Sequence, residues 1–218
     1  NFERLTQLNF VNAEFTNNCQ FRALSVNPYS KNLTFTRCGI SGILKLEGVQ
    51  NIKLNLFSGS CEELRIYNSN VASFNSDFCK IQKLAIIGKT GKCENIQIRG
   101  SLPTLSVNIR HNHINNFVFK ELKDFESFEV YDTNFYGQFD LSESNLTGAV
   151  FNNVNFKNAD LNLRRSYLAE GKFFNVDWKK NYLVDEGNLK DYQVQKETRE
   201  VYRQLKYVHQ NQSNKIDA

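Results

Sequence analysis

The sequence has one pair of closely spaced histidines, His111 and His113. Alternate side chains of a strand point to the same side, so the two imidazoles could bind one transition metal. A zinc site needs a third protein ligand, and the sequence nominates none. We therefore expect an exposed polar corner before Ile114.

Three carboxylates, Asp132, Asp140 and Glu143, lie near one another in the sequence. Two carboxylates on either side of a glycosidic bond would suit glycan hydrolysis. Outward carboxylates recur throughout this chain, however, and no pair stands out. The sequence names no catalytic residue, no cofactor-binding residue and no metal ligand, so we expect a protein that is not an enzyme.

Two other catalytic signatures are incomplete. The stretch 88–92 lacks the spacing of a phosphate-binding loop and the Ser or Thr that follows its lysine, so we expect a corner loop. Catalysis by a Ser/His/Asp triad has no elbow motif to support it.

The chain contains five cysteines and no Cys-x-x-Cys pair. They are Cys19, Cys38, Cys61, Cys79 and Cys93. A tetrahedral metal site needs clustered ligands, which this spacing does not offer. We expect a ladder of buried, reduced thiols, which indicates a cytosolic compartment; disulfides in a secreted chain are the alternative.

The elements that must position these residues repeat with a period of five between residues 139 and 161. The large apolar residues in this frame are Leu141, Leu146, Phe151, Phe156 and Leu161. A mostly small residue stands two positions before each, and Asn or Asp often stands directly before it. Neither a helix nor a strand has this period. We infer that every fifth residue points inward after the chain has turned a corner.

The frame extends beyond this run to 133–178, after a two-residue insertion, and it reappears over 8–40. The stretch Ala159-Asp160-Leu161-Asn162-Leu163 resembles the repeat of the pentapeptide repeat family. This resemblance implies an all-β solenoid, a right-handed quadrilateral β-helix with four five-residue sides in each coil.

The middle of the chain, 41–132, departs from this motif but contains apolar-x-apolar triplets. They begin at Leu44, Ile52, Leu64, Leu84, Ile96, Val107, Phe117 and Phe128. Each predicts a very short strand with two inward residues. We interpret the middle as an irregular continuation of the same β-helix, with roughly nine coils in all if each takes about 20 residues. A β-sandwich or barrel is the alternative.

The C-terminal part changes character. Residues 177–187 break the repeat and are typical of a cap, with Trp178 closing the core. An amphipathic helix is predicted over 189–212, with an apolar stripe of Val194, Thr198, Val201, Leu205 and Val208. The expected organisation is a β-helix over 1–182 and a cap with a helical tail over 183–218.

We also expect the chain to be part of a longer protein. It begins at Asn1 and contains no Met, and Ser213 is a plausible N-cap for a further helix. The stretch 197–218 resembles the helical segment that follows the repeats in some bacterial pentapeptide-repeat proteins, many of which continue into a membrane region. That resemblance implies a cytosolic module tethered to the inner face of a membrane.

The charge of the chain indicates whether it could mimic or bind nucleic acid. Some pentapeptide-repeat proteins mimic duplex DNA and bind topoisomerases, which requires an acidic surface. This chain has 27 Lys and Arg against 23 Asp and Glu, a net charge of +4, so we expect no nucleic-acid role. The basic pairs at 164–165 and 179–180 would suit anionic lipid, or are ordinary solvated charges.

The sequence therefore predicts a non-enzymatic scaffold without a cofactor, the interaction or sensing domain of a larger membrane-associated bacterial protein. A protein partner would bind the solenoid face, and the tail could form homo-oligomers. Two alternatives stay open: a standalone pentapeptide-repeat protein that binds a partner such as a topoisomerase, and a carbohydrate-active β-helix enzyme.

Overall fold

The computed structural model describes residues 7–22, 31–88, 92–99, 106–122, 125–179 and 191–211. These residues form a sheet of 17 strands and one helix. The elements are β1 (Gln7–Val11), β2 (Glu14–Phe15), β3 (Cys19–Arg22), β4 (Lys31–Thr36), β5 (Gly39–Glu47), β6 (Ile52–Phe57), β7 (Ser60–Tyr67), β8 (Val71–Asp77), β9 (Lys80–Ile87), β10 (Lys92–Arg99), β11 (Ser106–Arg110), β12 (His113–Phe119), β13 (Ser127–Phe135), β14 (Gln138–Asp140), β15 (Val150–Asn155), β16 (Asp160–Asn162), β17 (Lys172–Asp177) and α1 (Tyr192–Asn211).

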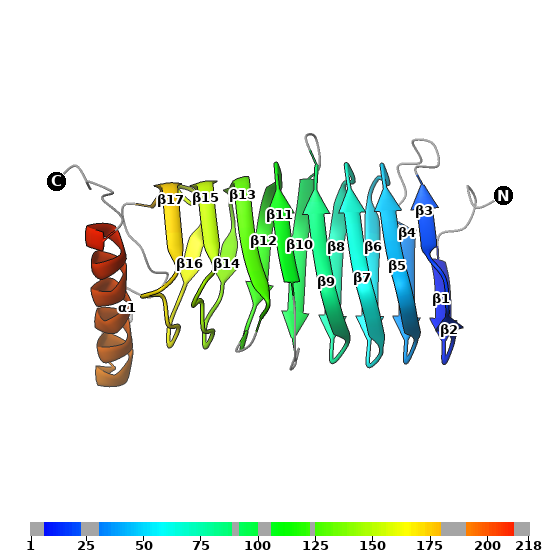
Figure 1. Ribbon diagram of the computed structural model, residues 1–218, viewed down its shortest axis with the longest axis horizontal. Coiled ribbons are helices and arrows are strands. Elements are labelled where there is room, and N and C mark those ends of the chain that lie inside the picture. The colour runs from blue at the N-terminus through cyan, green and yellow to red at the C-terminus, as the bar shows by residue number, and fades with distance from the viewer. Residues whose placement is uncertain are drawn as a thin grey trace.

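The strands pair in parallel and form two long stacks. One stack runs β1-β4-β6-β8-β10-β12-β14-β16, and the other runs β3-β5-β7-β9-β11-β13-β15-β17. Figure 1 shows the turns side by side along the long axis, with α1 at the end opposite the N-terminus. The chain is a parallel β-solenoid, as the sequence predicts, and not a sandwich; it has about seven turns.

The turns differ in length, which corrects the expectation of nine coils. Register partners are 20 residues apart from Leu64 to Leu84 and 25 apart from Leu8 to Leu33. Because several turns take more than 20 residues, the same chain makes about seven turns.

Each regular turn contributes four pairs of inward side chains, one pair to each side. In the turn 33–52 the buried pairs are Leu33 and Phe35, Cys38 and Ile40, Leu44 and Leu46, and Val49 and Ile52. The apolar-x-apolar triplets of the middle region supply such pairs, so this region does continue the solenoid. Register shifts between Ile40 and Ile43 and after Ile52 accommodate its irregular corners.

The five-residue frame holds in the structure. Its large residues Leu141, Leu146, Phe151, Phe156 and Leu161 are each at most 1% exposed. Stacked rings join successive turns, and the Phe151 ring lies on Phe173 with centroids 4.9 Å apart. Burial of a Phe side chain contributes about 1.5–3 kcal/mol, so this column is a main source of stability.

The Asn and Asp residues of the frame close its corners. Side-chain oxygens of Asp140, Asn145 and Asn155 accept the backbone N–H two residues ahead, at 3.0, 3.1 and 2.9 Å. Such side-chain turns satisfy a backbone donor where the strand ends, which is why Asn and Asp suit this place.

A further corner is made by non-glycine residues with positive φ. They are Arg37, Ser58, Phe78, Glu121, Glu143 and Arg165, with φ between 50° and 61°. This conformation costs of order 1 kcal/mol or more for such residues. The backbone N–H groups of five of these residues donate to a carbonyl of the next turn, as Arg37 does to Phe57 at 2.8 Å, and these bonds hold the strained corners; the five are Arg37, Ser58, Phe78, Glu121 and Glu143.

The C-terminal end of the stack is covered. Trp178 packs on Phe156 and Phe173, both at 5.5 Å between ring centroids, which agrees with its expected role. The predicted amphipathic helix is α1, and its residues Val201, Leu205 and Val208 are buried in the common core. The predicted boundary at 183 and Ser213 lie outside the described residues.

Polar contacts hold α1 on the last turns. The Asp191 carboxylate caps the helix by accepting the Gln193 N–H at 2.8 Å. Buried Glu197 accepts from Arg165 at 2.9 Å and from Gln193 at 2.7 Å. Hydrogen bonds from Gln193 and Arg165 lower the pKa of Glu197, since they outweigh its partial desolvation. Among the described residues, no helix is long and apolar enough to span a bilayer.

We predict that Ser76→Ala stabilises the protein. Ser76 occupies an inward column between Leu56 and Ile98, and its buried hydroxyl has no hydrogen-bond partner among the described residues. Removing this unsatisfied group should raise the free energy of unfolding by about 1 kcal/mol in urea denaturation.

The matched control is Ser144→Ala, at an equally buried serine. The Ser144 hydroxyl accepts the Leu122 N–H at 3.1 Å and donates to the Ser142 carbonyl at 3.3 Å. Ser144→Ala should lower the free energy of unfolding by about 1–3 kcal/mol. A Ser76→Ala variant that is destabilised as much as the control would contradict the inward placement of Ser76.

Candidate interaction surface

One outward column of the β3–β17 stack is rich in aromatic and cationic residues. We call it the tyrosine column: Arg22, Glu47, Tyr67, Ile87, Arg110, Tyr131, Asn152 and Phe174. These residues lie in one continuous register, each beside its counterpart in the next turn. With strands about 4.8 Å apart, the column is about 34 Å long.

Cations lie over both tyrosine rings of the column. The Arg110 guanidinium is 4.8 Å from the Tyr131 ring centroid, and the Lys45 ammonium is 5.5 Å from that of Tyr67. Arg110 is held in place by Asn108 at 2.8 Å and by Glu129 at 3.3 Å. Such cation–π contacts are worth about 0.5–1 kcal/mol at exposed sites.

The same cations are neutralised locally. Lys45 pairs with Glu47 at 3.0 Å, and its hydrogen bond lowers the pKa of that carboxyl group. Gln20 also donates to Glu47 at 2.9 Å. The column therefore presents pre-positioned aromatic and guanidinium groups without a large excess of charge, which is a composition typical of protein interfaces.

The neighbouring β1–β16 stack has a different outward surface. Asn75 donates to Asn55 at 3.0 Å, and Asn55 donates to Thr34 at 3.4 Å. These amides satisfy one another from turn to turn, so they have less to offer a partner than the tyrosine column.

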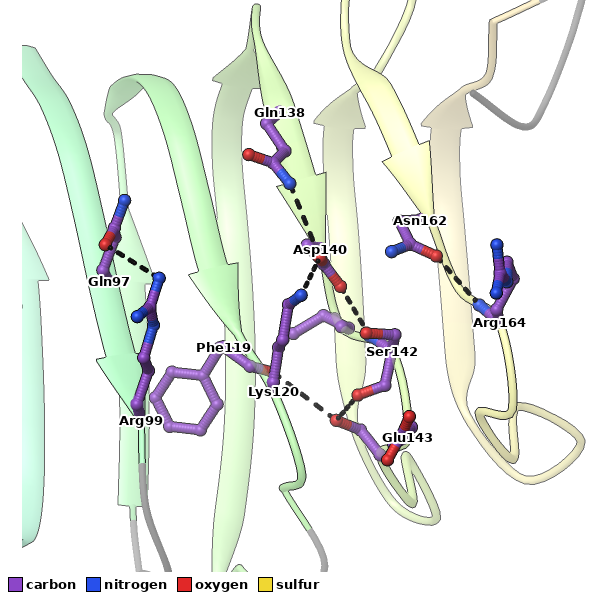
Figure 2. A network of polar contacts seen from close by, with 12 residues as sticks. Gln97, Arg99, Phe119, Lys120, Gln138, Asp140, Ser142, Glu143, Asn162 and Arg164 are labelled. Carbon is purple, nitrogen blue, oxygen red and sulfur yellow. Dashed lines mark hydrogen bonds and ion pairs between the residues drawn. The ribbon is translucent and has the colours of Figure 1, made fainter. Parts of the chain in front are cut away.

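Asp140 is the most deeply buried carboxylate of this second surface, with 1% exposure. It pairs with Lys120 at 3.1 Å and accepts the Ser142 N–H at 3.0 Å, and Gln138 approaches it at 3.5 Å (Figure 2). Burial alone would raise the pKa of Asp140, but hydrogen bonds from Ser142 and Lys120 outweigh it and lower the pKa. The group is thus a satisfied structural charge with no opening toward a substrate.

A model of the family described as pentapeptide repeats matches residues 137–171, with eight copies. This segment consists of pentapeptide repeats. Together with the parallel solenoid, the match fits the pentapeptide-repeat protein family. Comparison with curated proteins found no significant match, and neither did comparison with solved structures.

The pentapeptide repeats contain Asp140 and Glu143, two of the three carboxylates that were considered as catalytic candidates from the sequence. Each of the three carboxylates contacts a different basic side chain. Asp140 pairs with Lys120, Glu143 with Arg165 at 3.2 Å, and Asp132 faces His111 at 3.4 Å.

The two neighbouring histidines separate in the structure. His111 is a corner residue with φ of 52°, which interrupts the strand alternation, and it faces Asp132. His113 instead contacts Tyr136 at 3.3 Å and Asn134 at 3.4 Å. Both are exposed, as expected for a polar corner, and within the described ranges no group of three potential ligands could hold a metal.

All five cysteines are free, and all but Cys19 are buried. Burial raises the pKa of Cys61 and Cys93 to about 12 and that of Cys79 to about 11. The expected single ladder is wrong, however. Cys19 is in register with Leu44, and Cys93 is in register with Val71, because turn lengths differ from the cysteine spacing.

The predicted basic pairs have partners within the fold. Arg164 and Arg165 pair with Glu197 of α1 at 3.4 and 2.9 Å, so both contribute to holding the helix on the solenoid. Lys179 pairs with Asp160 at 2.6 Å. Lys180 and the middle of the loop 88–92 lie outside the described residues.

The tyrosine column escaped the sequence analysis. A signal was available, because Tyr67, Ile87, Arg110 and Tyr131 each directly follow an apolar-x-apolar triplet. The turn length decides which of these residues become neighbours, and that length was not evident from the sequence.

We predict that Asp140→Asn destabilises the protein at neutral pH. A depressed pKa means that the ionised group stabilises the folded state above its unfolded pKa, about 3.9, and that this contribution is lost as the pH falls through the lower folded value. We expect Asp140→Asn to lower the free energy of unfolding by about 1–3 kcal/mol near pH 7. Below about pH 4 the difference in the free energy of unfolding between the variant and the wild type should become smaller.

Urea unfolding at both pH values measures this difference. Asp160→Asn is the control, because its exposed pair with Lys179 should contribute at most about 1 kcal/mol. If Asp140→Asn lowers the free energy of unfolding by the same amount in acid as at about pH 7, the charge of Asp140 is not the source of its contribution to stability.

Proposed function

We propose that the solenoid is a scaffold that holds a protein partner along the tyrosine column. Proteins of this repeat family typically act as non-enzymatic scaffolds. The observation that supports this surface is the seating of Arg110 over Tyr131 at 4.8 Å. Tyr and Arg are enriched among the few residues that carry most of the binding energy of protein interfaces.

Pre-positioning strengthens the argument. Arg110 is hydrogen-bonded to Asn108 and paired with Glu129, so it loses little rotamer freedom when a partner binds. The ordering of a long side chain otherwise costs about 0.5–1.5 kcal/mol. A rigid column about 34 Å long is of the size needed for a standard interface of about 800 Å² on each partner.

The surrounding protein is part of this proposal. The tail resembles helical segments that precede a membrane region in some bacterial family members, and we propose that this scaffold belongs to a cytosolic, membrane-associated assembly. Its role there would be to bring the bound partner to a fixed distance from the membrane. The terminal helix would link the rod to the rest of the assembly.

The test is capture of partners by the immobilised chain and by an Arg110→Ala/Tyr131→Ala variant. The matched control is His113→Ala/Tyr136→Ala, which removes another outward tyrosine and its basic neighbour from a different side. We expect the first variant to lose a specific partner by at least about tenfold, since interface anchors are worth about 2 kcal/mol or more. The control should retain that partner.

Two results would reject the tyrosine column as the binding surface. One is equal capture by all three proteins. The other is equal loss from both variants, which would indicate general destabilisation or nonspecific adhesion.

A further inference from the structure

The outward side of α1 carries a line of cations. Lys196, Arg199, Arg203 and Lys206 are all exposed and follow one another at three- and four-residue steps. Such steps place side chains in one row on a helix, here about 15 Å long. Tyr192, 72% exposed, begins the same row. We call these five residues the basic ridge.

The basic ridge lies directly opposite the side of α1 that packs on the solenoid. The packed side contains Val201, Leu205 and Val208. Figure 1 shows α1 lying across the end of the stack. The ridge therefore forms the outer surface of that end, pointing away from the turns.

The charge of the ridge is only partly compensated. Arg203 is paired with Glu200, with two hydrogen bonds at 2.9 and 3.0 Å. Arg199 donates to the Gln195 carbonyl at 3.4 Å, which leaves its charge in place. Within the described part of the chain, Lys196 and Lys206 have no ion pair.

We propose that the basic ridge binds the anionic lipid headgroups of a bilayer and stands the solenoid upright on it. This rests on the membrane-associated part of the proposed function. The cations form a straight row on the outer side of the terminal helix. All of them can therefore contact a flat anionic surface at the same time. The amphipathic ring of Tyr192 suits the headgroup level.

The attachment is electrostatic and reversible. The apolar side of α1 is already buried in the core, so no hydrophobic face is free to insert. Each Lys or Arg near an anionic membrane contributes about 1 kcal/mol. This orientation leaves the tyrosine column on the flank of the rod, accessible to a protein partner.

The test is co-sedimentation of the full chain with phosphatidylcholine vesicles, with and without phosphatidylserine. The ridge variant is Lys196→Gln/Arg199→Gln/Lys206→Gln, which keeps good helix formers and leaves Arg203 with Glu200. The matched control neutralises three exposed solenoid lysines, Lys53→Gln/Lys80→Gln/Lys83→Gln.

We expect the wild type and the control variant to bind only vesicles that contain phosphatidylserine, and to be released by salt. The ridge variant should partition about a hundredfold more weakly, as three lost cations imply. A Lys196→Arg/Lys206→Arg variant should bind like the wild type. Far-UV circular dichroism should show the same helix in all variants.

Several results would overturn the proposal. They are unchanged binding by the ridge variant, equal binding to uncharged vesicles, and an equal loss in the control variant. Ridge-dependent binding of duplex DNA without vesicle binding would assign the ridge to nucleic acid instead. Partner capture at the tyrosine column is measured separately, so this proposal can fail while the scaffold function stands.

Discussion

Successive turns are joined by parallel backbone hydrogen bonds, and these bonds force each residue to lie beside its counterpart one turn away. The inward columns, such as Leu56, Ser76 and Ile98, follow directly from this register. So does the outward tyrosine column, in which Arg110 meets Tyr131 although they are far apart in sequence. A solenoid turn contacts only its neighbours, so both core and surface are built one rung at a time.

The same register explains where the fold accepts strain and buried polarity. Corner residues such as Phe78 and Glu143 adopt a left-handed conformation because their N–H groups must reach the next turn. Asp140 stays ionised in a nearly inaccessible position because Ser142 and Lys120 satisfy it. At the C-terminal end, where no further strand follows β17 in the described chain, Trp178 and α1 cover the last rung.

The sequence allowed the prediction of those features that repeat with a local period. The inward placement of Phe151 and Phe156 follows from the five-residue frame, and α1 follows from its apolar stripe. The number of turns did not follow, because corner lengths vary without a clear composition signal. Because the length of each turn was not known, the position of Cys19 was predicted wrongly and the tyrosine column was not predicted. Both depend on which residues become neighbours across turns. His111 and His113 separated for a local reason, a positive φ that strand alternation does not anticipate.

The register itself is tested most directly by a double-mutant cycle on Phe151 and Phe173, whose rings stack at 4.9 Å with an interplanar angle of 1°. Unfolding free energies of Phe151→Leu, Phe173→Leu and the double variant give their coupling. The solenoid predicts about 0.5–1.5 kcal/mol between these residues, and none between Phe151 and the equally buried but distant Phe74. Additive effects of Phe151 and Phe173 would show that these turns do not stack in this register.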